Sequence, residues 1–318
     1  MKRVLCVWFP HWPLQRVCLV QPELKGRPVV LYGPAGVGPG RANAPAQRGD
    51  WLVLHCARAA VAAGVRPGMP LAEAQALLER LHPPSSILHP LSSNLSQSCL
   101  IQHAPPTDRK LLQALANWGT RYSPLVGMEQ VDEPSALFVD ITGCAPLFGG
   151  EEQMAALVLH DFERVGYVAR VAVADTLGAA WAAVRFGRLI SPTKNQTAAP
   201  IIIPAGGQQA LLGALPVAAL RLPEKTIDTL HELGIRQIAQ LQELPRSALP
   251  ARFGSVVLER LDQAWGLVEE LIVPVPPIEP IEAAWSFEEP TADRRAIEAV
   301  LQRLIGEIAE VLATRQEG

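Results

Sequence analysis

The sequence lacks paired cysteines and long apolar runs, and these absences exclude several classes of protein. The five cysteines are scattered and never form a CxxC pair, which indicates reduced, mostly buried thiols and no zinc site. No stretch reaches about 18 consecutive apolar residues, so no membrane span is expected. The N-terminal apolar run is too short for a signal peptide and is broken by Pro10 and Pro13. We therefore expect a cytoplasmic protein without a membrane contact.

A net positive charge is also missing. The formal net charge is −3 and lysine is scarce, so any binding of nucleic acid must come from local basic patches rather than from the field of the whole molecule. The 49% hydrophobic and 19% charged fractions are typical of a protein that folds around a core. With 318 residues, the chain is long enough for two to four modules.

Strand and helix patterns alternate over the first two-thirds of the chain. We expect strands at 3–9, 27–33, 51–56, 136–142 and 167–175, and helices at 57–65, 70–81, 108–122, 151–166 and 177–189. This alternation predicts an α/β or α+β domain. The polar stretch 191–200 indicates a domain boundary, beyond which the pattern is helical and ends in a long amphipathic helix at 294–315.

Two helix-hairpin-helix patterns follow that boundary, at 222–244 and 245–266. Such elements bind the DNA backbone because hairpin amides and the next helix N-terminus point at a phosphate. An ordinary αα-hairpin with a glycine cap explains the pattern equally well. Pro223 stands where a DNA-gripping hairpin has an amide donor, so the first hairpin is expected to be the weaker one. The expected DNA contacts are Lys225, Gly234, Arg236, Arg246, Arg252 and Gly254.

The stretch EQVDEPSALFVDITG, residues 129–143, concentrates acidic side chains. Two-metal phosphoryl transfer needs carboxylates that converge on cations about 3.5–4 Å apart. The four carboxylates that could hold such a pair are Glu129, Asp132, Glu133 and Asp140.

Four segments together resemble the ImuB-like branch of the Y-family translesion DNA polymerases. LCVWFPHWPLQR is similar to the N-terminal strand region, LHCARAAVAAGVRPGMPLAEAQAL to the fingers, and LFVDITGCAPLFGGEE and VAVADTLGAAWAAVRFG to the palm. The similarity covers residues 2 to about 315. It implies a right-hand architecture with a palm at 1–12 and 89–192, fingers at 13–88, a helix-hairpin-helix thumb at 198–272, and an incomplete little-finger domain starting at 278–318.

The chain departs from the active members of this family at the metal site. Alignment of the first strand puts Val7 and Phe9 at the acidic positions, and counting back from Asp140 puts Ser135 and Ala136 at the others. Counting forward from residues 123–126 instead gives Asp132 and Glu133. We prefer the count from Asp140, because LFVDITG is the rigid strand. This count predicts that the chain has no catalytic residues. The carboxylates are then expected mostly to cap a turn and face solvent, and to hold at most one weakly bound Mg²⁺.

The nucleotide-binding residues of the family are also largely replaced. The fingers tyrosine and arginine align with Arg58 and Val61, and the palm lysine aligns near Gly187, close to Arg185 and Arg188. Arg58 is the residue left to meet a phosphate.

The resemblance implies a non-catalytic adaptor in damage-induced mutagenesis and translesion synthesis. Its expected partners are DNA, the replication clamp, an ImuA-like protein of the RecA type, and an error-prone DnaE-type polymerase. In the family the clamp- and partner-binding segments lie in the C-terminal part, beyond the end of this chain. Two alternatives stay open: a residual polymerase that uses Asp132, Glu133 and Asp140, and a helix-hairpin-helix DNA-binding module whose α/β portion makes only protein contacts.

Overall fold

The computed structural model describes residues 2–34, 51–81, 99–187, 199–276, 281–287 and 289–315. The chain forms two compact units, Met1–Val275 and Pro276–Gly318. Within the described ranges, none of the helices combines the length and the apolar character that crossing a bilayer would require.

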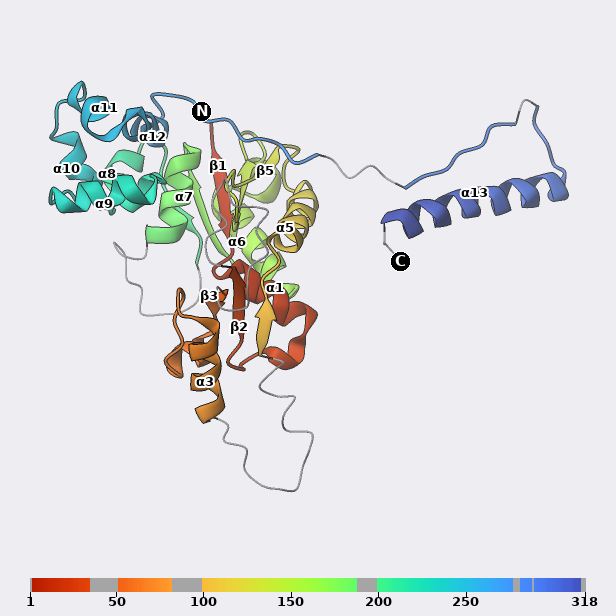
Figure 1. The fold of residues 1–318 in the computed structure, drawn as a ribbon. Coiled ribbons are helices and arrows are strands. Elements are labelled where there is room, and N and C mark those ends of the chain that lie inside the picture. Colours follow the sequence, from red (N-terminus) through yellow and green to blue (C-terminus); the bar gives the residue numbers. More distant parts are fainter. Residues whose placement is uncertain are drawn as a thin grey trace. The chain divides into compact units, whose positions relative to one another are not determined.

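A five-stranded sheet organises the first unit, and its central strand is the first of the chain (Figure 1). Strand β1 pairs antiparallel with β6 on one side and β7 on the other, while β5 and β8 lie at the edges. Because β1 has neighbours on both sides and is covered on both faces, it is a continuous apolar run. The strands are β1 Val4–Trp8, β5 Val126–Met128, β6 Ala136–Asp140, β7 Arg170–Ala174 and β8 Ile201–Ile202.

The alternation of side chains along β1 builds two cores. Val4 and Cys6 face one core, which contains helix α7 (Leu177–Phe186). Leu5 and Val7, with Phe9 beyond the end of the strand, belong to the other core, which contains α5 (Pro105–Gly119) and α6 (Glu151–Arg164). A short 3₁₀ helix, Ala145–Phe148, leads into α6.

A second sheet, of three strands, has the order β3-β2-β4. It packs with α2 and α3 on one cluster of side chains and with α1 on another. Helix α1 was not expected from the sequence. Its Pro13 lies in the first turn and is compatible with the helix, because the first amides of a helix have no partner within the helix. The elements are α1 Trp12–Val20, β2 Val30–Pro34, β3 Trp51–Cys56, α2 Arg58–Ala62, α3 Leu71–Leu81 and β4 Leu100–Gln102, with a 3₁₀ turn at Pro22–Leu24.

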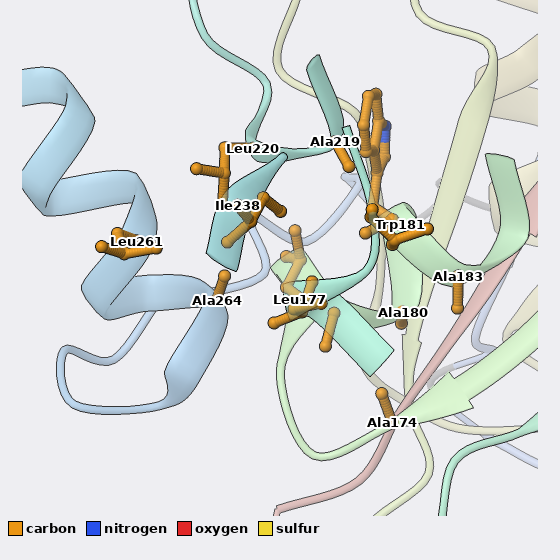
Figure 2. Close-up of a cluster of buried hydrophobic side chains, with 14 of the residues drawn as sticks. Ala174, Leu177, Ala180, Trp181, Ala183, Ala219, Leu220, Ile238, Leu261 and Ala264 are labelled. Atoms are coloured by element: carbon orange, nitrogen blue, oxygen red, sulfur yellow. The ribbon is translucent and has the colours of Figure 1, made fainter. Parts of the chain in front are cut away.

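Helix α7 joins the sheet to a helical module through a continuous apolar core (Figure 2). The small side chains of α7 allow close packing: a Cβ added at Gly178 would lie 3.1 Å from the Cα of Ala264 in α12. Most of the expected boundary at 191–200 lies outside the described residues. The module consists of α8 Gln208–Gly213, a 3₁₀ turn Val217–Leu220, α9 Glu224–Glu232, α10 Ile238–Gln242, α11 Ala248–Phe253 and α12 Ser255–Trp265.

The second unit contains α13, Arg294–Arg315. Two ion pairs lie along it, Arg294–Glu298 and Arg303–Glu307, and in each the two partners are four residues apart. The guanidinium of Arg303 lies 4.6 Å from the ring centroid of Trp285. Apolar side chains of this helix such as Ile305 are exposed.

All five cysteines are free thiols, as expected, but only Cys6 and Cys99 are buried. The expectation that most of them are buried is therefore wrong. Burial raises the pKa of the Cys6 thiol far above its ordinary value, which leaves it protonated and unreactive.

The strands and helices expected over the first two-thirds of the chain form, with ends shifted by up to about three residues. The elements that were missed are short or lack a period: β4, β5, β8 and α8 as well as α1.

Gly127 tests how tightly the segment after α12 packs against β5. A Cβ at this position would lie 2.3 Å from the carbonyl oxygen of Val273 and 2.5 Å from Cγ2 of Ile272. Because one of these atoms is backbone, we expect Gly127→Ala to lower the free energy of unfolding by about 1–3 kcal/mol, measured by urea denaturation. The control is Gly213→Ala, whose Cβ meets only Ala239 at 3.8 Å. Equal stability of the two variants would contradict this packing.

Candidate functional site

A cavity of about 220 Å³ lies where the end of β1 meets β3 and the turn before β6. Trp8 and Ser135 line it from the five-stranded sheet, and His55 lines it from β3. Glu133 and Arg185 are among its other polar lining residues, together with His11, His103 and Asp108.

The positions aligned with the family's acids carry no charge. Val7 and Phe9 are 1% and 0% exposed, and the Phe9 ring lies 5.1 Å from that of Phe162 within the core. The amide of Phe9 donates to the carbonyl of Ser135 at 2.9 Å, so the ends of β1 and β6 are adjacent. Ala136 is fully buried. A cation placed between these strand ends would find no carboxylate from any of the four positions.

Glu129 does not face solvent, and the expectation that it would is wrong. It follows β5, is 6% exposed, and accepts hydrogen bonds from Trp181 Nε1 at 2.7 Å and Arg185 Nη2 at 3.0 Å. Arg185 Nη2 also donates to Ser135 Oγ at 2.9 Å. The Arg185 guanidinium stacks on two indoles, 4.4 Å from the Trp181 centroid and 5.1 Å from that of Trp8. The charge of Glu129 is therefore already compensated within the protein.

Sequence reasoning noted Arg185 only as a neighbour of the palm lysine position. Its partnership with Glu129 joins α7 to the end of β5, 56 residues apart in the chain. A contact between residues so far apart in the chain cannot be predicted from the spacing of neighbouring residues.

The remaining three acids do not converge. Asp132 is exposed, and Glu133 is half exposed at the cavity. Asp140 pairs with Val4, whereas Ala136 pairs with Trp8 at the opposite end of β1. Four residues of strand separate Asp140 from that end by about 13 Å. Asp140 also accepts the amide of Thr142 at 2.9 Å, which caps the turn as expected. The alternative site built from Asp132, Glu133 and Asp140 is not assembled, because its acids lie at opposite ends of β6.

Two histidines that sequence reasoning did not select face Glu133. His55 Nε2 lies 3.6 Å from Glu133 Oε2, and His103 Nδ1 lies 3.8 Å from Oε1. The interaction with His55 lowers the pKa of Glu133 below its usual value, and the charge of His103 acts in the same direction, while partial burial opposes both. His55, His103 and Glu133 come from three separate segments, so no sequence spacing could have grouped them.

Arg58 does not line the cavity beside Glu133. It is exposed at the first residue of α2 and borders a separate groove of about 590 Å³, together with Lys25, Cys18 and Val61. Most of that groove is apolar. A phosphate at Arg58 would therefore lie in a neighbouring groove and not in the cavity that Arg185 lines, although His11 borders both.

The helical module presents most of the predicted DNA contacts at its surface. Lys225, Arg236 and Arg252 are exposed. Gly234 and Gly254 have φ angles of 79° and 83°, in the left-handed region that favours glycine, at the turns between α9 and α10 and between α11 and α12.

Two other arginines of the module are engaged. Arg246 pairs with Asp262 at 2.6 Å, and Arg221 Nη1 donates to Glu270 at 2.8 Å. Arg221 precedes the first hairpin, and its charge is engaged by Glu270.

Comparisons with known proteins identify the family and the fold of the chain. The profile of the impB/mucB/samB family matches residues 7–185. Protein ImuB of Caulobacter vibrioides is 40% identical over 188 residues, which cover 59% of this chain and 38% of that protein. DNA polymerase IV of Dehalococcoides mccartyi is 25% identical over 302 residues, covering 93% of this chain and 66% of that protein. The chain thus spans well under half of the ImuB relative.

Solved structures give the same fold. The insertion ternary complex of Dbh DNA polymerase superposes with a TM-score of 0.60 at 18% identity, covering 85% of this chain and 69% of that one. DinB from Sulfolobus solfataricus superposes with a TM-score of 0.55 at 17% identity, with the same two coverages. These likenesses establish the fold that the resemblance implied.

Glu129 is expected to stabilise the packing of α7 against the five-stranded sheet through its charge. Glu129→Gln keeps an acceptor for Trp181 but leaves Arg185 without its counter-charge, and we expect a loss of about 1–3 kcal/mol in the free energy of unfolding. Urea denaturation measures it. The matched control is Asp132→Asn in the adjacent exposed turn, expected to change stability by less than about 0.5 kcal/mol. A Glu129 variant as stable as this control would show that the buried pair contributes nothing.

Proposed function

The chain belongs to the impB/mucB/samB family and has the Y-family polymerase fold, and from this premise we propose that it is a non-catalytic, cytoplasmic, polymerase-like adaptor in damage-induced translesion synthesis. The observation that supports this most directly is the state of the metal site. Val7, Phe9, Ser135 and Ala136 supply no carboxylate, and the nearby Glu129 is held by Arg185 and Trp181. Two-metal phosphoryl transfer depends on free, converging carboxylates.

The adaptor role extends to three kinds of partner. By resemblance to ImuB, these are the replication clamp, an ImuA-like protein of the RecA type, and an error-prone DnaE-type polymerase that performs the synthesis. A polymerase-like fold without the chemistry retains a use in such an assembly, because it can hold primed DNA while another enzyme extends it. No bound cofactor is needed for that role.

DNA is held, in this proposal, by backbone contacts from the helical module. The turn at Gly254 precedes α12, whose first amides have no partner within the helix and whose N-terminus carries a partial positive charge. Exposed Arg252 stands two residues before that turn. Together they suit one phosphate group. Gly234, Lys225 and Arg236 form the corresponding, weaker contact at the first hairpin, and Arg246 must leave Asp262 before it can contribute.

Primer extension tests the absence of chemistry. The protein is incubated with a primed template, all four nucleotides, and Mg²⁺ or Mn²⁺, in a preparation shown by gel shift to bind that template. We expect no extension. A variant with Asp132, Glu133 and Asp140 changed to alanine runs in parallel, and extension by the parent that this variant loses would overturn the proposal in favour of a residual polymerase.

Salt dependence of binding tests the assignment at the second hairpin. Arg252→Ala is expected to weaken binding to DNA of any sequence, because phosphates carry no base information, and to reduce the slope of log K against log salt by about 1. Fluorescence anisotropy over a salt series measures both. Arg164→Ala removes an exposed arginine from the end of α6 and serves as the control. A slope equal to that of the control would remove Arg252 from the interface.

A further inference from the structure

His55, His103 and Glu133 form a cluster that the proposed adaptor role does not use. Each offers one ligand atom, and these three atoms lie within 4.8 Å of one another. They come from β3, from the residue after β4, and from the turn before β6. We propose that the three side chains bind a divalent transition-metal ion of the zinc type, through donors other than the positions aligned with the family's metal-binding acids, although Ser135, one of those positions, lines the same cavity.

The spacing of the donor atoms is close to what a zinc ion requires. Tetrahedral coordination with bonds of about 2.0–2.2 Å sets donor atoms about 3.3–3.6 Å apart. The Glu133 oxygens already lie 3.6 Å from His55 Nε2 and 3.8 Å from His103 Nδ1. These two distances run to different oxygens of Glu133, so binding of the metal through one carboxylate oxygen requires an adjustment of up to about 1 Å in the Glu133 side chain. Because Glu133 lies half exposed in a turn, it can make that adjustment.

The hydrogen bonds of His103 prepare it to bind a metal. Its Nε2 lies 2.8 Å from Oδ2 of Asp108, and its side chain is 2% exposed. Asp108 is itself buried and paired with Arg16, so in a neutral His103 this carboxylate acceptor favours the tautomer with the proton on Nε2. The lone pair is then on Nδ1, the atom that faces Glu133. A carboxylate behind a metal-binding histidine fixes its tautomer and orientation in this way.

The cluster is closed on one side and open on the other. His103 is buried, whereas the side chains of His55 and Glu133 are 27% and 50% exposed at the cavity. Zinc sites can have three protein ligands and an open fourth position. Here the fourth position would face the cavity of about 220 Å³. Two imidazoles favour a transition metal over Mg²⁺, which prefers oxygen ligands. The bound ion would join β3 to the turn that contains Glu133.

The competing arrangement has no metal. The rings of His55 and His103 already make an edge contact, with centroids 5.0 Å apart at 75°, and Glu133 can accept from a protonated His55 without any ion. The two arrangements differ in metal stoichiometry. They also differ in the effect of removing one ligand, because a metal site loses affinity when any of the three is replaced.

Zn²⁺ titration of chelator-treated protein, in competition with a chromogenic chelator, distinguishes them. We expect one equivalent of Zn²⁺ to bind with a dissociation constant in the micromolar range or below, and Co²⁺ to give a visible absorption band at the same stoichiometry. Glu133→Gln and His55→Gln, both at partly exposed positions, should each weaken Zn²⁺ binding at least tenfold while circular dichroism shows a folded protein.

Two controls fix the interpretation. Asp132→Asn removes the neighbouring exposed acid, and His160→Gln removes an exposed imidazole on α6. Both should bind Zn²⁺ as the parent does. The proposal would be overturned if the parent protein did not bind one equivalent of Zn²⁺ saturably. It would also be overturned if the parent and both ligand variants bound Zn²⁺ with equal affinity. Thermal denaturation gives a second readout, since Zn²⁺ should raise the Tm of the parent but not of Glu133→Gln.

Discussion

The burial of β1 is the constraint on which the rest of the structure depends. This strand hydrogen-bonds to β6 and β7 on its two sides, and its alternating side chains supply both cores of the first unit. An unpaired carboxylate at such a place costs several kcal/mol unless a cation compensates it. Apolar Val7 and Phe9 remove that cost, and they remove the first ligands of the metal site at the same time.

The Glu129–Arg185 pair avoids the cost of a buried unpaired carboxylate in another way. The buried carboxylate of Glu129, beside the first residue of β6, accepts hydrogen bonds from a guanidinium and an indole N–H, and the guanidinium lies over the rings of two tryptophans. The cation is thus a covalent part of the chain instead of an ion from solution. This arrangement stabilises the fold without a metal, and it occupies the acid that could have contributed to one.

Much of the architecture could be predicted from residue patterns. The continuous apolar run of β1 and the amphipathic period of α6 each define an element over many residues. The segments 5–16, 54–77, 137–152 and 171–187 carry the family resemblance. Short pieces such as β5 could not be found, because three residues hold no measurable period and pair only when β6 lies beside them. Helix α1 was missed because Pro13 interrupts the apolar run, although the first turn of a helix accommodates a proline.

The sequence by itself determined that the first strand carries no acid, since residue identity at Val7 and Phe9 is all that this requires. Only the tertiary structure decided what the remaining acids do. Glu129 is buried against α7, Asp140 lies at the far end of β6, and Glu133 meets two histidines, although all three belong to one short stretch. The physical reason is that charge compensation acts between groups close in space. Those neighbours come from segments that only folding brings together.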